Sequence, residues 1–306
     1  MSVADYLQRW LESDARRTCG ERTWENYERS VRREIAPRIG PVVLQKLKAI
    51  QVQNLMAQMD RAGASPWTRQ QARMTLHRAL SRAVRLGYIP QNPVTLVEPP
   101  KIPHKPIQVL TSLESRKLLE AAKEDRLFAL YVLAITGGLR QGELFGLLWE
   151  DVDWDDPAVV VQRSLDRSGR FVEPKTTTSR RRVDLPEMTI AALREHRVRM
   201  DGEGHGSPIL FCDTEGKPLR QSNVLRRSFQ PLLERAGIRR IRFHDIRHSH
   251  ASQLLALGES AKVVQERLGH AGSAITLRIY SHLLPGMQRR AATKLGELLG
   301  GAPILR

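Results

Sequence analysis

Residues 267–282 read RLGHAGSAITLRIYSH and place the phenol of Tyr280 ten residues after the imidazole of His270. Two upstream stretches add further reactive groups, FHDIRH at residues 243–248 and TGGLRQGEL at residues 136–144. Cleavage of a phosphodiester puts negative charge on the non-bridging oxygens and requires a nucleophile and a proton for the leaving group. A phenol, imidazoles and guanidiniums together meet these needs without a metal ion. The three stretches therefore predict chemistry on a phosphodiester.

The charge of the chain agrees with a nucleic-acid partner. Its 306 residues include 49 Lys and Arg against 33 Asp and Glu, which gives a formal net charge of +16 and a pI of about 10.6. Such a balance favours a polyanion as partner, and nucleic acid is the first candidate. Arginine greatly outnumbers lysine, which a base-composition bias of the genome also explains, but that bias does not account for the net charge.

The sequence also indicates a compartment. Its two cysteines, Cys19 and Cys212, cannot form a disulfide framework in a chain of this length, which favours a reducing environment. The N-terminus lacks the pattern of a secretory signal, and no apolar run approaches the roughly 18 residues of a membrane span. We expect a cytoplasmic, nucleoid-associated protein with no membrane partner.

Prolines divide the chain. Six of them fall within residues 90–106, which excludes a helix interior and predicts an extended, semi-rigid linker. We expect a helical domain over residues 1–92, a linker over residues 93–110 and a second domain over residues 111–306, with a tail at residues 283–306.

The first domain has the pattern of amphipathic helices. Apolar residues recur at helical spacing over residues 2–14, 49–61 and 66–86, and Thr23 is expected to cap a further helix. These helices would form the core of a separate, all-helical domain.

The predicted helix over residues 66–86 is strongly basic. It carries five arginines beside its apolar stripe, and no carboxylate lies between Arg61 and Gln91. A solvated face would account for such cations, but phosphate contact explains better why no acidic residue balances them. The arginines predicted to bind DNA here are Arg69, Arg73, Arg78 and Arg82.

The second domain is predicted to be mainly helical with one small antiparallel β-sheet. Thr111 and Glu114 form a capping-box signature, and the apolar residues 127–135 indicate a buried helix. The pattern then becomes strand-like, and the helical period returns from about Pro186. The strands are expected at residues 159–161, 170–173 and 181–185.

The spacing of arginines and histidines suits a site. Arg140 follows a glycine pair, and Glu143 lies one helical turn further on, where its carboxylate can hold the guanidinium. Arg247 follows His244 by three residues, so both lie on one face of a helix. Taken alone, Arg140 and Glu143 would equally describe a surface salt bridge, and Tyr280 a packing residue.

Metal sites are less well supported. The acidic residues within 150–156 lie between an apolar helix and a strand, where acidic loop residues are common. His244, His248 and His250 suggest zinc, but no metalloprotease glutamate lies between the helical pair and no cysteine is near. No metal site is expected.

In order and spacing, the motifs resemble those of the tyrosine recombinases, the phage integrase family. The resemblance covers residues 111–285 closely, and residues 2–92 resemble the family's helical core-binding domain more loosely. Between the motifs, PKTTTSRR at residues 174–181 is similar to the sheet turn that carries the family's lysine. The matching positions are Arg140, Lys175, His244, Arg247, His270 and Tyr280.

The resemblance implies a role for each matching residue. Tyr280 would attack the scissile phosphate, form a 3′-phosphotyrosyl bond and release a 5′-hydroxyl. Arg140 and Arg247 would clamp the non-bridging oxygens, because a guanidinium binds two oxygens at once. His244 would act as general acid and base on the tyrosine proton, and His270 would hydrogen-bond the phosphate.

Lys175 would protonate the leaving 5′-oxygen, although its role depends on the register of a turn. Arg180 and Arg181 beside it would be alternative phosphate contacts. Because the covalent link preserves the energy of the broken bond, the resemblance implies neither ATP nor a metal or other cofactor.

The resemblance also implies partners. The substrate would be double-stranded DNA with core-type recombination sites, bound by two domains and acted on by a homo-tetramer, with a possible accessory directionality factor. Residues 283–306 would dock on a neighbouring protomer, the alternative being packing on their own domain. Helical spacing begins almost at Met1, so the family's additional arm-binding domain is not expected in this chain.

Two other functions fit part of the sequence. A type IB topoisomerase uses similar chemistry to relax supercoils, and it would not join two different duplexes. A non-enzymatic, architectural DNA-binding protein descended from a recombinase would have lost at least one of the six matching positions, and none is lost.

Overall fold

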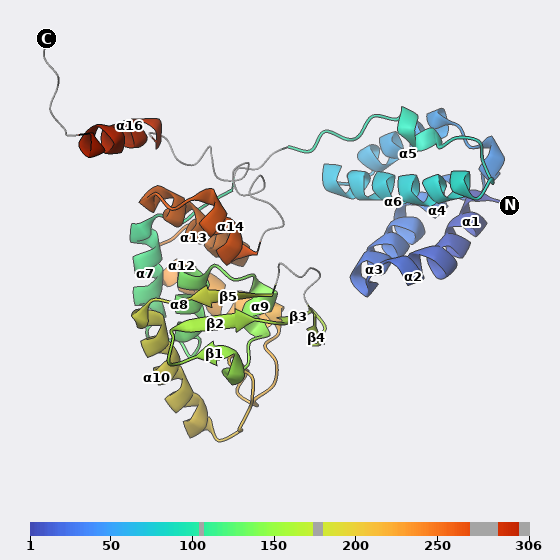
Figure 1. The fold of residues 1–306 in the computed structure, drawn as a ribbon. Helices are drawn as coiled ribbons and strands as arrows, with labels where there is room; N and C mark the ends of the chain where they lie inside the picture. The colour runs from blue at the N-terminus through green and yellow to red at the C-terminus, as the bar shows by residue number, and fades with distance from the viewer. Residues whose placement is uncertain (104–106, 174–179, 270–286, 300–306) are drawn as a thin grey trace, which may run out of the picture. The chain divides into compact units, whose positions relative to one another are not determined.

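The computed structural model describes residues 1–103, 107–173, 180–269 and 287–299. The chain divides into two compact units, Met1–Lys105 (unit 1) and Pro106–Arg306 (unit 2), shown in Figure 1. Helices dominate both units, and the strands among the described residues belong to unit 2. The predicted class, mainly α with a small antiparallel sheet, is confirmed. None of the helices in these ranges is long and apolar enough to span a membrane.

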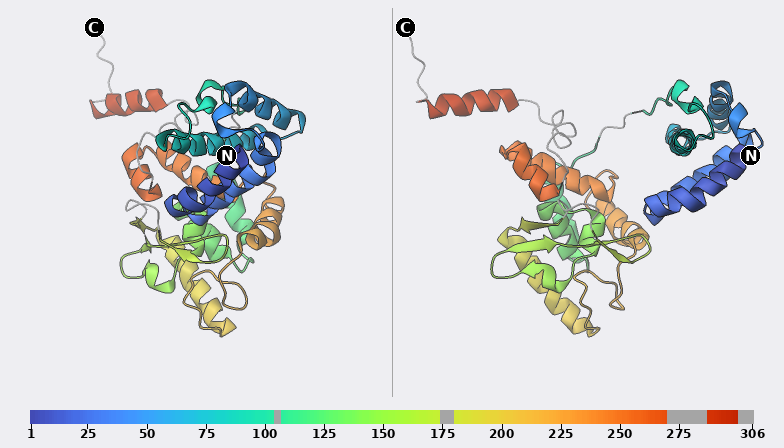
Figure 2. Two further views of the ribbon diagram at one scale, coloured as in Figure 1. Left: turned by 90° about the vertical axis from the view of Figure 1, so that its right-hand side faces the viewer. Right: turned by 45° about the vertical axis from the view of Figure 1, so that its right-hand side comes forward.

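Unit 1 is a set of helices around one apolar core. Helices α1, η1 and α2 follow one another without a break (Figure 2), as do α3, η2 and α4, and α6 packs against α3 and η2. The side chains of Leu7, Leu55, Leu76 and Leu80 on the facing sides are completely buried. The elements are α1 (Val3–Trp10), η1 (Leu11–Ala15), α2 (Arg16–Thr18), α3 (Glu21–Ser30), η2 (Val31–Ile35), α4 (Ala36–Ile39), η3 (Leu44–Lys46), α5 (Ala49–Arg61), α6 (Pro66–Arg85) and η4 (Pro93–Leu96).

One predicted helix cap is wrong. Helix α3 begins at Glu21 with Gly20 at its N-cap, so Thr23 lies inside the first turn. The Gly20 carbonyl accepts hydrogen bonds from the backbone N–H groups of Thr23 and Trp24. Packing sets this start, because the indole N–H of Trp24 donates to the Leu11 carbonyl at 3.0 Å.

The segment expected to be a linker, residues 93–110, begins with ordered structure. Pro93–Leu96 forms the 3₁₀ helix η4, and the side chains of Val94 and Val97 are buried in the core of unit 1. Arg73 donates from Nε and Nη2 to the Val97 carbonyl at 3.1 and 2.6 Å. Apolar residues between the prolines thus attach the start of this segment to unit 1, which proline content alone does not reveal.

Unit 2 contains two small antiparallel sheets among its described residues. Strand β2 pairs with β1 and β5, with Val159 opposite Val152 and Val183. Strands β3 and β4 form a separate pair, because β3 packs against α9 instead of extending the first sheet. The elements that form the sheets and their surroundings are α7 (Ser112–Ala122), α8 (Phe128–Gly137), α9 (Gln141–Phe145), η5 (Trp149–Asp151), β1 (Val152–Asp153), β2 (Ala158–Val161), β3 (Ser164–Leu165), β4 (Phe171–Val172) and β5 (Arg181–Asp184).

The remaining described elements of unit 2 are helical. Helix α10 packs along α8, and α13 packs on both α8 and α14. The elements are α10 (Glu187–Glu203), α11 (Gln221–Val224), η7 (Leu225–Phe229), α12 (Gln230–Arg235), α13 (Phe243–Leu257), α14 (Ala261–Leu268) and α16 (Met287–Leu298).

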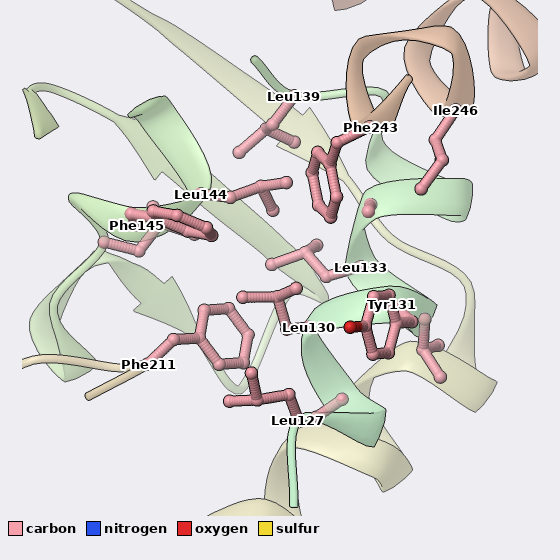
Figure 3. Close-up of a cluster of buried hydrophobic side chains, with 14 of the residues drawn as sticks. Leu127, Leu130, Tyr131, Leu133, Leu139, Leu144, Phe145, Phe211, Phe243 and Ile246 are labelled. Carbon is pink, nitrogen blue, oxygen red and sulfur yellow. The ribbon is translucent and has the colours of Figure 1, made fainter. Parts of the chain in front are cut away.

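The core of unit 2 surrounds α8. The side chains of Leu130, Tyr131 and Leu133 are completely buried, and Figure 3 shows them in a cluster that reaches Phe145 and Phe243. The Phe243 ring centroid lies 6.4 Å from that of Tyr131 and 6.3 Å from that of Phe145. Because Phe145 ends α9 and Phe243 begins α13, this aromatic packing fixes both helices on α8. Arg140 precedes the first of these helices as its N-cap, and His244 and Arg247 lie on the second.

Candidate active site

The end of α8 fixes the position of Arg140. Gly138 closes the helix with φ +61°, and a Cβ on it would lie 2.4 Å from the ring of His250. Arg140 is the N-cap of α9, and its backbone N–H donates to the Glu143 carboxylate at 2.8 Å. The glycine turn therefore places the guanidinium at the start of a short, capped helix.

Two glycines let α9 lie directly on β3. A Cβ on Gly142 would be 2.5 Å from Ser164 Oγ, and a Cβ on Gly146 would be 2.9 Å from the backbone nitrogen of Leu165. Only residues without a side chain allow this approach. No role is predicted for these glycines from their residue type, although their spacing of four places them on one face of a helix.

Glu143 is the charged centre of the site. Its carboxylate lies 2.7 Å from Arg140 Nη1, 2.9 Å from Arg181 Nη2 and 3.9 Å from Arg247 Nη1. Burial would raise its pKa, but the hydrogen bond from Arg181 and the charges of the three arginines outweigh burial and lower the pKa to about 2. Glu143 is therefore ionised and links arginines from α9, β5 and α13.

The same arginines hold the C-terminal end of α14. Arg181 Nε donates to the carbonyl of Arg267 at 2.6 Å, and Arg247 Nη2 donates to the carbonyl of Leu268. Arg140 Nη2 donates to the carbonyl of Gly269 at 3.0 Å. Cationic donors are favourable at a helix C-terminus, where carbonyls lack helical partners and the helix dipole is negative. In the sequence, His270 directly follows this clamped end.

The histidines of α13 differ in exposure. His244 keeps part of its surface open to solvent, whereas His248 is buried, and their rings meet edge to face at 4.8 Å. Desolvation lowers the pKa of His244, and the charge of Arg247 lowers it further. Desolvation also lowers the pKa of His248 to about 4, with the charge of His244 adding to the effect. Both imidazoles are therefore neutral near pH 7.

The structure brings together only part of the predicted set. Arg140, Glu143 and Arg247 are joined through the contacts above, and His244 lies near enough to Arg247 and Arg140 for their charges to lower its pKa. The remaining predicted catalytic residues, Lys175, His270 and Tyr280, lie outside the described residues.

Arg180 and Arg181, which follow the stretch that contains Lys175, differ from each other in exposure. Arg180 is exposed and lies 3.5 Å from Glu173. Arg181 is buried, with 7% of its side chain exposed, and takes part in the ion pair with Glu143. The Arg181 guanidinium is therefore engaged inside unit 2, whereas that of Arg180 is exposed.

The predicted DNA-binding arginines of unit 1 also have partners within that unit. Arg69 pairs with Asp60 at 3.0 Å, and Arg82 pairs with Asp14 at 2.7 Å. The Arg78 guanidinium lies over the ring of Tyr27 at 5.7 Å from its centroid. A surface pocket of unit 1 is lined by Trp10, Asp14, Arg17, Thr18, Arg78, Arg82 and Arg85.

The acidic residues considered as metal ligands take part in ion pairs. Asp151 pairs with Arg163 at 2.6 Å. Arg182 pairs with Asp153 at 2.7 Å and with Asp156 at 2.6 Å. Across the described ranges, no group of His, Cys, Asp and Glu side chains is arranged to hold a metal ion.

Comparison with known proteins identifies the family. The profile of the phage integrase family matches residues 108–286, and that of the phage integrase N-terminal SAM-like domain matches residues 2–59. A tyrosine recombinase XerC-like protein of Caldanaerobacter subterraneus subsp. tengcongensis is 32% identical, covering 97% of this chain and 83% of the relative. The ICEBs1 integrase of Bacillus subtilis is 27% identical, covering 84% of this chain and 72% of the relative.

Solved structures show the same fold. The Tn1549 transposon integrase in complex with a circular intermediate DNA has a TM-score of 0.80 at 22% identity, covering 96% of this chain and 99% of that chain. A lambda integrase tetramer bound to a Holliday junction has a TM-score of 0.69 at 21% identity, covering 92% and 77%. The topoisomerase and architectural alternatives are not favoured by these matches. The chain belongs to the phage integrase family of tyrosine recombinases, the enzymes that cleave and rejoin DNA at specific sites.

Proposed function

We propose that Tyr280 is the nucleophile of this recombinase and that Arg140 and Arg247 bind the scissile phosphate. The observation that carries the proposal is the convergence of both guanidiniums on Glu143 and on the carbonyls of Leu268 and Gly269. His270 follows this segment directly, and Tyr280 lies ten residues further along the chain. Attack by the phenol forms a 3′-phosphotyrosyl bond and releases a 5′-hydroxyl.

The electrostatics of the described residues suit this step. Glu143 is ionised and orients Arg140, whose side chain keeps 38% of its surface exposed and open to an anion. Arg247 has 3% of its side chain exposed and supplies a fixed positive charge behind it. Charge that grows on the non-bridging oxygens in the transition state is stabilised by cations already held in place. Arg140 and Arg247 thus supply what a metal ion supplies in other phosphoryl-transfer enzymes.

Proton transfer falls to a histidine and a lysine. His244 is neutral near pH 7, because desolvation and Arg247 lower its pKa, and so it accepts the Tyr280 proton during cleavage. It returns that proton when the strand is rejoined. Lys175 protonates the leaving 5′-oxygen, and His270 hydrogen-bonds the phosphate. The phosphotyrosyl bond retains the energy of the broken phosphodiester, so rejoining needs no ATP.

The two-domain arrangement follows from the same proposal. Residues 1–92 bind core-type DNA with Arg69, Arg78 and Arg82, and residues 111–306 carry out the chemistry, with Arg180 as a further phosphate contact. The basic charge of +16 favours duplex DNA as partner. Since DNA is the substrate, we place the enzyme in the cytoplasm, with the nucleoid.

The assembly on DNA is a homo-tetramer, because exchange of two duplexes needs four strand cleavages. In α16, Leu295 and Leu299 beside it have 56% and 77% of their surface exposed, so apolar side chains of the tail are available to a neighbouring protomer. A directionality factor would bias the reaction. If a variant that lacks the tail still assembles on DNA as wild type does, the tail packs on its own domain instead.

The experiment is trapping of a covalent adduct on a nicked core site, where loss of a short 5′-hydroxyl strand prevents rejoining. Wild-type protein is expected to form a protein–DNA band that resists denaturation, and Tyr280→Phe is expected to bind DNA with equal affinity and form none. Tyr88→Phe, in unit 1, is the matched control and is expected to form the adduct. An adduct with Tyr280→Phe would overturn the assignment of the nucleophile.

A further inference from the structure

Arg181 connects α9, which carries Glu143, to the end of α14. It is the first residue of β5, and its side chain is 7% exposed. Nη2 lies 2.9 Å from Glu143 Oε2, and Nη1 lies 3.3 Å from Oε1. The Nε of the same guanidinium donates to the carbonyl of Arg267 at 2.6 Å. One side chain therefore reaches from β5 to α9 and to α14.

We propose that Arg181 is a positioning residue for strand cleavage, which holds the Glu143–Arg140 pair and the end of α14 in one geometry. This inference rests on the proposed function, in which Arg140 binds the scissile phosphate. Arg181 acts through Glu143 and through the backbone that precedes His270, and it does not itself contact the DNA. It replaces the earlier prediction that Arg181 binds a phosphate.

The charge balance at Glu143 supports this role. Arg181 supplies the strongest of the effects that lower the pKa of Glu143, acting against burial, and the Arg247 Nη1 atom lies farther away, at 3.9 Å. Without Arg181, the carboxylate would lose its closest buried cation. Arg140 is 38% exposed, so its side chain has room to follow a displaced carboxylate away from the site.

The geometry requires arginine and not only a positive charge. A guanidinium offers donors on three nitrogens in a rigid plane, so it reaches both carboxylate oxygens and the Arg267 carbonyl together. A lysine ammonium is a single point of donation on a flexible stem and cannot span these acceptors. Arg181→Lys therefore keeps the charge and removes the connection.

The position of Arg181 in the chain extends its influence. The stretch with Lys175 lies immediately before Arg180 and Arg181 in the sequence. On the other side, Arg181 pairs with Val161 of β2 in the antiparallel register. Strand β5, which follows the stretch that contains Lys175, is thus fixed at its first residue to the sheet, to α9 and to α14.

The test compares Arg181→Lys with Arg182→Lys. Arg182 is the adjacent residue of β5, and its guanidinium pairs with Asp153 and Asp156 instead of Glu143. Three quantities are measured: the melting temperature, the affinity for a core-site duplex, and the rate of adduct formation at saturating DNA. For Arg181→Lys we expect near wild-type melting and affinity with adduct formation slowed about 100-fold, as a misplacement of about 1 Å causes. Arg182→Lys is expected to keep the wild-type rate.

A second variant guards against misfolding. Arg181→Gln retains an amide donor without the charge, and it is expected to show the same loss of rate at saturating DNA. Combining Arg181→Lys with Glu143→Gln is expected to slow adduct formation no further than the slower single variant, because both act through one unit. Additive losses would contradict the shared route.

Two results would overturn the inference. A loss confined to DNA affinity, with a wild-type rate at saturation, would make Arg181 a direct phosphate contact. A wild-type rate in Arg181→Lys and Arg181→Gln would remove any role in cleavage. Failure of the proposed function is distinguishable from both, because wild-type protein would then form no adduct through Tyr280.

Discussion

Arg247 donates from Nη1 to the carbonyl of Gly138 at 2.8 Å, so the arginine of α13 is held by the residue that closes α8. Arg140 lies two residues after the same glycine, so the same turn sets the position of its backbone. Both guanidiniums of the site therefore depend on one backbone conformation. The packing of the Tyr131 ring on Phe243 holds α8, which ends in this turn, against α13.

Gly138→Ala is expected to abolish adduct formation. A residue with a side chain at φ +61° costs about 1–2 kcal/mol in backbone strain, and its Cβ would also meet the His250 ring. Gly169→Ala is the control, because Gly169 has φ +81° and open space around the position of a Cβ. Both variants carry the backbone strain, but only Gly138→Ala adds the collision with His250. Comparing their free energies of unfolding and their adduct yields therefore separates the two effects. Equal activity of the two variants would show that the Gly138 turn does not place the arginines.

Gly142→Ala is expected to lower both the free energy of unfolding and the cleavage rate. The added methyl would lie 2.5 Å from Ser164 Oγ and 2.9 Å from the Leu165 carbonyl, so α9 must move away from β3. Overpacking of this kind costs about 1–3 kcal/mol. Gly202→Ala in α10 meets nothing within 4 Å and should stabilise the protein slightly. A Gly142→Ala protein as stable and active as wild type would contradict the close packing of α9 on β3.

Glu143→Gln is expected to destabilise the protein by about 3 kcal/mol at neutral pH, because it leaves buried arginines without their carboxylate. The folded-state pKa of Glu143, about 2, is lower than its ordinary value of 4.5. Ionised Glu143 therefore stabilises the fold fully above pH 4.5, and this contribution is lost as the pH falls from 4.5 towards 2. Urea unfolding of wild type and Glu143→Gln across this window should show the difference shrinking. A difference that is constant with pH would mean that the charge of Glu143 is unimportant.

How much of this site the sequence predicts depends on the range of each interaction. The pairing of Glu143 with Arg140 was predicted because the two residues lie one helical turn apart, and the structure gives their ion pair at 2.7 Å. The buried helix over residues 127–135 was predicted from its apolar run and is confirmed as α8. Local spacing carries this information, because a helix turns every 3.6 residues.

Contacts between distant segments were not predictable from spacing. Arg181 and Arg180 look alike in the sequence, yet the structure buries Arg181 against Glu143, 38 residues away, and leaves Arg180 exposed. Likewise, Arg73 belongs to the arginine-rich face of α6, but its guanidinium donates to the Val97 carbonyl 24 residues away. A single sequence gives no signal for such pairings, since neither a period nor a motif joins the two partners.

Cleavage is expected to fall at acidic pH through His244. Its folded-state pKa lies below the ordinary 6.5, so the imidazole is neutral above that value and able to take the tyrosine proton. As the pH falls through the folded pKa, His244 becomes protonated, the cleavage rate drops, and the fold loses stability because the unfolded chain binds the proton more readily. Single-turnover adduct formation between about pH 5 and 8 measures this. His244→Gln should be slow throughout and lack the acidic limb, and an unchanged limb would exclude His244 as the base.

The arginines of α6 are expected to fall into two classes when DNA binding is measured against salt. Arg78 lines the surface pocket of unit 1, and Arg73 donates to the carbonyls of Val94 and Val97. Loss of one phosphate contact reduces the slope of log affinity against log salt by about 0.9. Arg78→Gln should show this reduction and keep the wild-type melting temperature. Arg73→Gln should instead lower the melting temperature with little change in slope, because its hydrogen bonds attach residues 93–97 to the core of unit 1. A reduced slope for Arg73→Gln alone would reverse the two roles and place the phosphate on the other side of α6.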